Sequence, residues 1–292
     1  KGLSLQAAGR FLFPQNFGSL IHNGQKGEDG KRLFVDANLK LSGSLTNGDN
    51  FHVSFFGSGE QEYRGYANKD YTFNSENDNY QLGGNATYTK RWNKHGASTG
   101  SVSYSRFQSS ISEFYIKEGQ GISQDSGTYY NGSQNRIAEL RARIDHEFPA
   151  RRIHRLGFGA AYVLNRSILE FDSISIPLAR GQNDVSRVNA YVKEEFFLGK
   201  YLTLQPGVKL DVTLEDPKVY FQPRVGIMAK PNKHWRIRLS WGIYYQFITE
   251  NAFVDPFGNQ VYFWQVADGS RTYVQQSMQY VAGASFNKWG LN

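Results

Sequence analysis

Residues 35–55 read VDANLKLSGSLTNGDNFHVSF, and the order of apolar and polar side chains in this stretch decides the fold class. Between Val35 and Leu45 every second residue is apolar or glycine, and each residue between them is Asp, Asn, Lys or Ser. A period of two is typical of a β-strand with one apolar and one polar face. The Asn47-Gly48 pair is the strongest short signal for a β-hairpin, and apolar residues resume at Phe51 and Val53. The stretch therefore predicts two antiparallel strands joined by a tight turn.

The same alternation recurs along most of the chain. Four further hairpins are predicted at residues 80–107, 135–164, 188–213 and 219–245, and single strands at residues 2–10 and 278–286. This makes about twelve strands of roughly ten residues each, and a helical alternative fails because the period is two almost throughout. Glu194 interrupts the apolar face of its strand, and we interpret it as lying at a membrane interface.

The composition excludes several classes of protein. Of the 292 residues, 15% are aromatic, whereas disordered chains have few aromatic residues. The chain has no Cys, which excludes a disulfide scaffold and Cys-ligated zinc or iron–sulfur sites. The longest charge-free window, residues 272–287, is too short and too polar for a membrane-spanning helix. An all-β protein remains, either a soluble β-sandwich or an outer-membrane β-barrel.

The connections between the predicted strands alternate in length. Short turns fall near Asn47, Asn93, Ala150, Gly199, Asn232 and Lys288, and aromatic residues lie close to all six. The long connections are residues 11–32, 58–79, 108–134, 165–184 and 246–274, and residues 214–218 form one short exception. Outer-membrane barrels have short periplasmic turns, long extracellular loops and aromatic girdles, whereas long structureless loops are uncommon in compact soluble domains. The pattern favours an antiparallel transmembrane β-barrel, in which tilted strands of about ten residues span an apolar band of about 25 Å.

The polar face of the predicted strands carries charges of both signs. A water-filled or plugged lumen explains such a face, and a solvent-exposed sandwich face would have a similar composition. The charged residues are Arg141, Arg143, Asp145, Glu147, Lys193, Glu195, Lys209, Asp211, Arg224, Arg236 and Arg238. On the opposite face we expect Val53, Leu140, Phe158 and Leu239 to point into lipid.

Residues 190–246 carry an ordered succession of motifs. They read AYVKEEFFLGKYLTLQPGVKLD from Ala190 and FQPRVGIMAKPNKHWRIRLSWGIYYQ from Phe221. The succession resembles the barrel domain of TonB-dependent outer-membrane transporters, in which a Tyr-Val-Gln-Asp-Glu-Trp strand precedes a Leu-Thr-Leu-x-x-Gly-Leu-Arg-x-Asp strand and a Pro-Arg strand. The matching positions are Tyr191, Val192, Glu194 and Glu195, then Leu202, Thr203, Leu204, Gly207, Lys209 and Asp211, then Pro223 and Arg224. Lys193 replaces the Gln of the family and Phe196 its Trp, and the strand end at residues 242–246 resembles Bacteroidetes-type members.

The resemblance implies a fold and a function for the whole protein. Barrels of this family have 22 strands, so residues 1–292 are expected to form a partial outer-membrane β-barrel domain, with no plug domain, TonB box, signal peptide or terminal strand recognisable in the chain. The implied function is active uptake of a nutrient such as a siderophore, glycan or peptide across the bacterial outer membrane. Substrate would bind at the extracellular loops and the plug domain. The implied partners are outer-membrane lipid and lipopolysaccharide, the protein's own plug domain, TonB, and a surface lipoprotein as a further candidate.

No constellation of side chains predicts catalysis, so we expect no enzymatic activity, no cofactor and no metal site. His146 and His154 flank one short turn, but turn or interface histidines are a simpler interpretation than a metal pair. The oxygen-rich residues 74–79 lack the spacing of a calcium loop, and the basic residues 151–155 are too short a run for a nucleic-acid surface. Two alternatives remain open: a self-contained twelve-stranded outer-membrane enzyme of the phospholipase or protease type, and a soluble carbohydrate-binding β-protein.

Aromatic residues in the long connections are the best candidates for contact with a substrate. Such side chains stack on sugars or grip peptides and large organic chelates. The candidates are Phe253, Asp255, Phe257, Tyr262 and Trp264 in one connection, Tyr66 and Tyr71 in a second, and Tyr129 and Tyr130 in a third. We expect residues 246–274 to fold over the mouth of the barrel as a lid. The alternative is that these aromatic side chains only pack the loops against one another.

Overall fold

A computed structural model describes residues 2–17, 29–67, 71–117, 127–173, 176–254 and 260–287. Within these residues the chain is almost entirely β-structure, and its one helix is a short 3-10 turn, Asn93–His95. No helix in this part of the chain is long and apolar enough to cross a membrane. The prediction of an all-β fold is confirmed.

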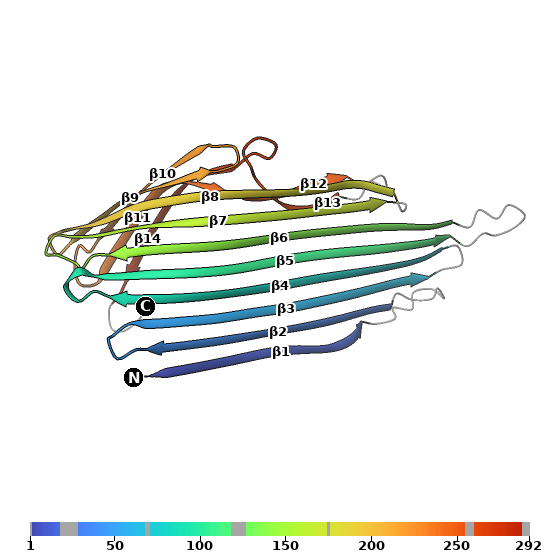
Figure 1. The fold of residues 1–292 in the computed structure, drawn as a ribbon, viewed down its shortest axis with the longest axis horizontal. Helices are drawn as coiled ribbons and strands as arrows, with labels where there is room; N and C mark the ends of the chain where they lie inside the picture. Colours follow the sequence, from blue (N-terminus) through green and yellow to red (C-terminus); the bar gives the residue numbers. More distant parts are fainter. Residues whose placement is uncertain are drawn as a thin grey trace, which may run out of the picture.

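Twelve of the described strands form one curved antiparallel sheet (Figure 1). Each strand pairs with the next one along the chain, except that β14 pairs with β11 because β12 and β13 form a separate hairpin. The strands of the sheet are β1 (Leu3–Phe17), β2 (Asp29–Ser44), β3 (Asn50–Ala67), β4 (Tyr71–Arg91), β5 (Ala97–Lys117), β6 (Gly127–Glu147), β7 (His154–Ser173), β8 (Ile176–Leu198), β9 (Leu202–Thr213), β10 (Val219–Ala229), β11 (Trp235–Gln246) and β14 (Gln275–Phe286). The predicted number of strands in the sheet is confirmed.

The register of the sheet confirms the predicted alternation of faces. Leu140 of β6 lies opposite Tyr104 of β5 and Leu164 of β7, and Leu239 of β11 lies opposite Ile227 of β10. Apolar rows thus continue from strand to strand on one face. Leu140 and Leu239 are exposed there, whereas the β12–β13 hairpin packs against the other face of the sheet. We call the apolar face the outer face and the polar face the inner face.

The strands β3 to β8 are longer than predicted. The strands β4, β5 and β6 have 21 residues each, whereas β9, β10 and β11 have 11 or 12. The predicted loops at residues 58–79 and 108–134 are therefore mostly strand, and so are the parts of residues 11–32 and 165–184 that the structure describes. The reason is that backbone hydrogen bonds to a neighbouring strand persist beyond an apolar band, where neither face needs apolar side chains. Alternation detects the lipid-facing part of a strand and misses its polar extension.

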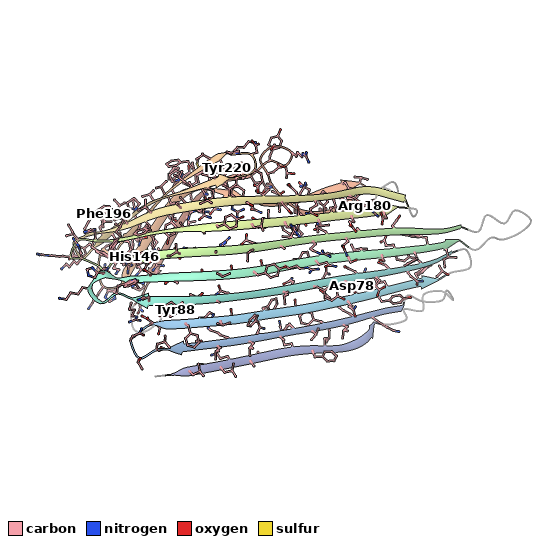
Figure 2. All side chains as sticks on the ribbon, in the orientation of Figure 1. Asp78, Tyr88, His146, Arg180, Phe196 and Tyr220 are labelled. Atoms are coloured by element: carbon pink, nitrogen blue, oxygen red, sulfur yellow. The ribbon has the colours of Figure 1, made fainter. Side chains whose placement is uncertain are left out.

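The predicted short turns gather at one end of the sheet, which we call the short-turn end. They cover residues 45–49, 92–96, 148–153, 199–201 and 230–234. Figure 2 shows Tyr88, His146 and Phe196 toward this end, and Asp78 and Arg180 toward the opposite end. The predicted turn near Lys288 lies outside the described residues.

A buried carboxylate closes the first short turn. Asp49 accepts hydrogen bonds from the Tyr88 hydroxyl at 2.6 Å, from the Arg91 backbone N–H at 2.9 Å and from the Asn47 side-chain amide at 2.7 Å. The Tyr88 and Arg91 bonds lower the pKa of Asp49 below its usual value. Gly48 takes a positive φ of 84° in this turn, which glycine adopts without steric cost. The turn predicted at Asn47-Gly48 is confirmed, and so is the positive φ that such a turn requires.

Candidate functional site

The connection at residues 246–274 contains a hairpin that lies on the inner face of the sheet. Its strands are β12 (Ile248–Val254) and β13 (Gln260–Val266). β13 lies alongside β6, β7 and β8, as Figure 1 shows. Residues 246–274 therefore do not form a structureless loop, and the position of the hairpin as a lid over the barrel mouth stays a prediction.

Apolar side chains hold the hairpin against the twelve-stranded sheet, which we call the wall. Val266 packs in a buried cluster with Ile137 of β6 and Val185 of β8, and Ile248 packs against this cluster. Ile137 and Val185 lie at inward positions, between outward neighbours such as Ala138. Burial of these side chains supplies the main force for docking, because apolar area is removed from water.

Three side chains of the wall also satisfy the free backbone edge of β13. The Asn135 side chain accepts a hydrogen bond from the Trp264 N–H at 2.7 Å and donates one to the Trp264 carbonyl at 2.8 Å. Ser167 Oγ accepts from the Val266 N–H at 3.2 Å, and the Asn183 amide donates to the Val266 carbonyl at 2.9 Å. These side chains replace the neighbouring strand that an edge strand otherwise lacks.

An aromatic cluster fixes the far part of the hairpin. Phe171 of β7 exposes 4% of its surface, and its ring meets Phe253 edge-on at a centroid distance of 4.6 Å. Phe253 in turn lies 5.8 Å from the ring of Phe263. Such contacts contribute beyond simple burial. Phe253 therefore packs the hairpin onto the wall.

A network of buried charges lies at the base of the hairpin. Arg187 donates to Asn165 Oδ1 at 2.6 Å and lies 3.7 Å from Asp211 and 3.8 Å from Glu139. Its guanidinium also lies 4.3 Å from the centroid of the Phe247 ring, at the residue that joins β11 to β12. A cation over an aromatic face is attracted to it, so Arg187 links the charged wall to the root of the hairpin.

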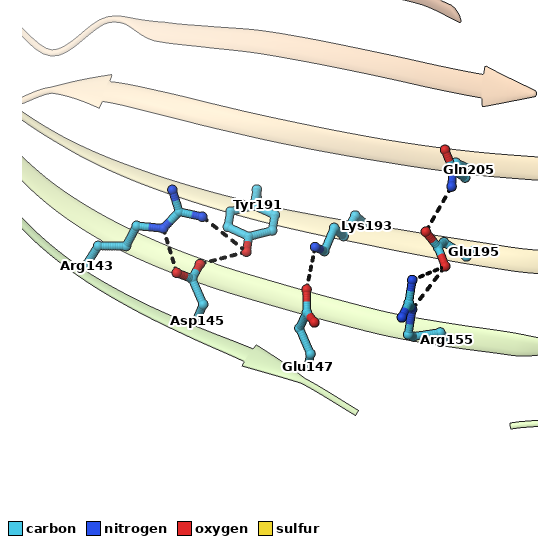
Figure 3. Close-up of polar contacts among 8 residues, drawn as sticks. All are labelled: Arg143, Asp145, Glu147, Arg155, Tyr191, Lys193, Glu195 and Gln205. Carbon is cyan, nitrogen blue, oxygen red and sulfur yellow. Dashed lines mark hydrogen bonds and ion pairs between the residues drawn. The ribbon is translucent and has the colours of Figure 1, made fainter. Parts of the chain in front are cut away.

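Ion pairs continue along the inner face toward the short-turn end (Figure 3). Arg143 and the Tyr191 hydroxyl both bond to Asp145, at 2.7 and 2.6 Å. The remaining links are Lys193 to Glu147 at 2.6 Å, Arg155 to Glu195 at 2.6 Å and Gln205 to Glu195 at 2.8 Å. Several of the charged residues predicted to line a lumen are thus neutralised in pairs on one wall.

Residues 267–274 are tied to the short connection at residues 214–218. Lys218 Nζ donates to the Gly269 carbonyl at 2.7 Å, and the Ser270 hydroxyl donates to Asp216 at 3.0 Å. The Lys218 ammonium and the Ser270 hydroxyl lower the pKa of the Asp216 carboxyl. Both ends of the hairpin are therefore held in place: its start at Phe247 and the segment that leads from it to β14.

The structure brings together some of the predicted substrate-contacting residues and separates others. Phe253, Tyr262 and Trp264 lie on the hairpin, where Tyr262 is 61% exposed and Trp264 37% exposed. Tyr66 lies in β3 opposite Phe73, so its assignment to a loop is wrong. Tyr71 in β4 and Tyr129 and Tyr130 in β6 are likewise strand residues, for the reason given above for the long strands. Asp255 and Phe257 lie outside the described residues.

The residues that dock the hairpin were not predicted from the sequence. Asn135, Ser167 and Asn183 resemble any other polar residues of an inner face. A usable indication was present at Ile137 and Val185, because both are apolar residues at inward positions. Apolar residues on the polar face of a barrel strand predict that another segment covers them.

The two histidines do not form a site together. His146 Nδ1 lies 2.8 Å from the Ser98 hydroxyl, whereas His154 Nδ1 lies 3.0 Å from Glu194. Residues 74–79 belong to β4, so their side chains alternate between the two faces. No group of three or more potential metal ligands is found in the described part of the chain.

We expect replacement of Asn135 by Leu to loosen the hairpin, because the Trp264 N–H and carbonyl lose their partner. Leaving such groups unpaired costs about 1–3 kcal/mol. Hydrogen exchange of the Trp264 and Val266 amides should become faster. Asn189→Leu, at an inner-face position of β8 nearer the short-turn end, is the matched control and should leave these amides unchanged. Equal protection in the two variants would contradict the assigned role of Asn135.

Comparisons with known proteins agree with this architecture. A family model described as "TonB dependent receptor-like, beta-barrel" matches residues 15–286. Among solved structures, the RagAB peptide transporter is similar with 12% identity and a TM-score of 0.61 over 98% of this chain and 41% of that chain. A mutant of the ferric enterobactin receptor PfeA from Pseudomonas aeruginosa shares 11% identity with a TM-score of 0.50 over 99% of this chain and 51% of that chain.

The siderophore receptor PirA from Acinetobacter baumannii is also similar, with 12% identity and a TM-score of 0.52 over 98% of this chain and 51% of that chain. No curated protein matches the chain at a significant level. The chain thus spans between 41% and 51% of the length of these three structures. Of the three, RagAB has the highest TM-score.

Proposed function

Because this chain belongs to the TonB dependent receptor-like β-barrel family, which lies in the bacterial outer membrane, we propose that it forms part of the wall of a nutrient transporter. The transported solute is a siderophore, a glycan or a peptide, and energy arrives through TonB. The outer-membrane location does not agree with the alternative of a soluble carbohydrate-binding protein. The siderophore receptors and the peptide transporter of similar fold support uptake as the general activity.

The observation that carries this proposal is the hairpin on the inner face. A hairpin docked on the inner face narrows the lumen of the barrel. It also presents the exposed side chains of Tyr262 and Trp264 to a solute in that lumen. A passive membrane wall needs neither a buried anchor such as Phe171 nor the paired side chains at Asn135. We propose that the hairpin contacts the solute on its way through the barrel.

The remaining parts of the transporter follow from the same proposal. The described residues contribute twelve strands to a larger barrel, and the edge strands β1 and β14 pair with further strands, because lipid does not tolerate unpaired strand edges. A plug domain closes this barrel and contacts TonB. A surface lipoprotein is a candidate partner at the end opposite the short turns.

Uptake by cells that produce the full-length protein tests the proposal. Labelled candidate solutes should accumulate in cells with TonB and not in cells without it. Deletion of residues 252–264, with a Gly-Ser linker in their place, should leave the barrel folded because no strand of the main sheet is removed. It should reduce uptake severalfold.

Heat-modifiable mobility in gels is the control for folding of the deletion variant. Normal mobility with unchanged uptake would remove the hairpin from the mechanism. Uptake that does not depend on TonB would contradict the proposed function itself.

A further inference from the structure

An apolar cleft lies between the hairpin and the inner face of the neighbouring strands. Its floor is made of small residues, because Gly83 of β4 lies beside Ser105 of β5 in register. Phe56 of β3 and Phe107 of β5 are wall residues, and Ile248 and Trp264 of the hairpin cover it. The cleft has a volume of about 560 Å³, which falls in the range of small-ligand pockets.

The cleft differs in charge from the rest of the inner face. Farther along β6 to β9 that face carries paired charges, as in the contacts of Arg143 and Glu147. Arg106 is the one charged residue among those that line the cleft. It lies in register with the outer-face residues Leu82 and Ala138, so its side chain belongs to the outer face and not to the cleft. The side chains that face the cleft are therefore uncharged.

The cleft is also open, although its walls are aromatic. Trp264 remains 37% exposed, and Phe56 and Phe107 are half-buried. The cleft continues the hairpin–wall interface, because Ile248 packs against the buried cluster that contains Ile137, and both residues also line the cleft. Docking of the hairpin thus completes the cleft and leaves its centre unfilled.

We propose that this cleft binds an uncharged aromatic or branched aliphatic group of the transported solute, such as the side chain of an apolar amino acid in a peptide. The inference rests on the proposed function, since it assigns the chemical class of the solute. Burial of a ring between Phe56, Phe107 and Trp264 supplies the binding energy. A charged group is disfavoured, because the facing side chains offer it no counter-charge. The Ser105 hydroxyl and the Gln81 amide lie at the same site and can bond to the polar backbone of a peptide.

Fluorescence quenching of the purified full-length protein in detergent tests this proposal. The probe is the capped tripeptide N-acetyl-Gly-(4-bromophenylalanine)-Gly-amide, because bromine quenches a nearby indole. Quenching should be saturable in the wild type and largely lost in Trp264→Phe. The same peptide with alanine in the central position should not compete, and the peptide with unmodified phenylalanine should.

A filled cleft provides the matched comparison. A Cβ added at Gly83 meets its nearest neighbour, the Tyr104 carbonyl oxygen, at 3.8 Å, and a Cβ at Gly181 meets nothing within 4 Å. Gly83→Leu should weaken probe binding at least tenfold. Gly181→Leu, on β8 and outside the cleft, should change it less than twofold. If Gly83→Leu does not fold, Phe107→Ala replaces it and should weaken binding about fivefold.

The outcomes separate this inference from the proposed function. The cleft would be overturned as a binding site if quenching were not saturable, or if Gly83→Leu bound the probe as tightly as the wild type. It would also be overturned if another segment of the full-length protein occupied the cleft. Binding in detergent requires no TonB. Probe binding without TonB-dependent uptake would therefore leave the cleft standing and contradict transport, and the reverse result would contradict the cleft alone.

Discussion

Replacement of Leu140 by arginine is expected to destabilise the folded barrel by about 2–4 kcal/mol, the cost of a charged side chain at the lipid-facing midplane. Leu140 is exposed on the outer face, between Tyr104 and Leu164 of the neighbouring strands. Val53, Phe158 and Leu239 are expected to point into the same lipid and should respond in the same direction. Urea titration of the protein refolded into liposomes measures the change.

Arginine at inner-face positions is the control for this prediction. Ser54 and Ser240 alternate with the lipid-facing Val53 and Leu239 along β3 and β11. Ser54→Arg and Ser240→Arg should cost much less than Leu140→Arg, because the inner face already accommodates charges. If the two sets of variants lost the same free energy of unfolding, the assignment of the faces would be wrong.

Replacement of Asp211 by alanine is expected to destabilise the protein by about 3–5 kcal/mol, the typical result of removing one partner from a buried ion pair. Asp211 is fully buried, with Lys209 Nζ at 2.7 Å and Arg187 Nε at 3.7 Å. It also accepts a hydrogen bond from the Gln222 amide. Without the carboxylate, Lys209 loses its counter-charge, and the buried Arg187 loses the nearer of its two carboxylate partners in a poorly hydrated part of the wall.

Asp184 provides the matched control for the Asp211 variant. It pairs with Arg166 at 2.7 Å, but both side chains are substantially exposed. Asp184→Ala should cost less than about 1 kcal/mol, as exposed ion pairs do. The same urea titration measures both variants. A loss at Asp211 no greater than the loss at Asp184 would show that the network around Arg187 is hydrated and not a buried structural element.

The sequence alone determined the features that depend on short-range order. Alternation around Leu140 predicted the faces of β6, because successive side chains of a strand point to opposite sides. The Asn47-Gly48 pair predicted the first turn, because its backbone conformation requires a residue that tolerates positive φ. The motifs between Ala190 and Gln246 identified the family that the family model also matches.

Only the tertiary structure decided where the strands end and what covers the inner face. Polar extensions such as residues 108–117 of β5 have no apolar alternation, so their pairing with β6 was visible only in the assembled sheet. Likewise, only the tertiary structure showed that three of the candidate residues, Phe253, Tyr262 and Trp264, lie on one hairpin. The bonds that dock this hairpin join Asn135 to Trp264, which are 129 residues apart. No local pattern encodes such a contact, because it depends on the curvature and register of the strands between them.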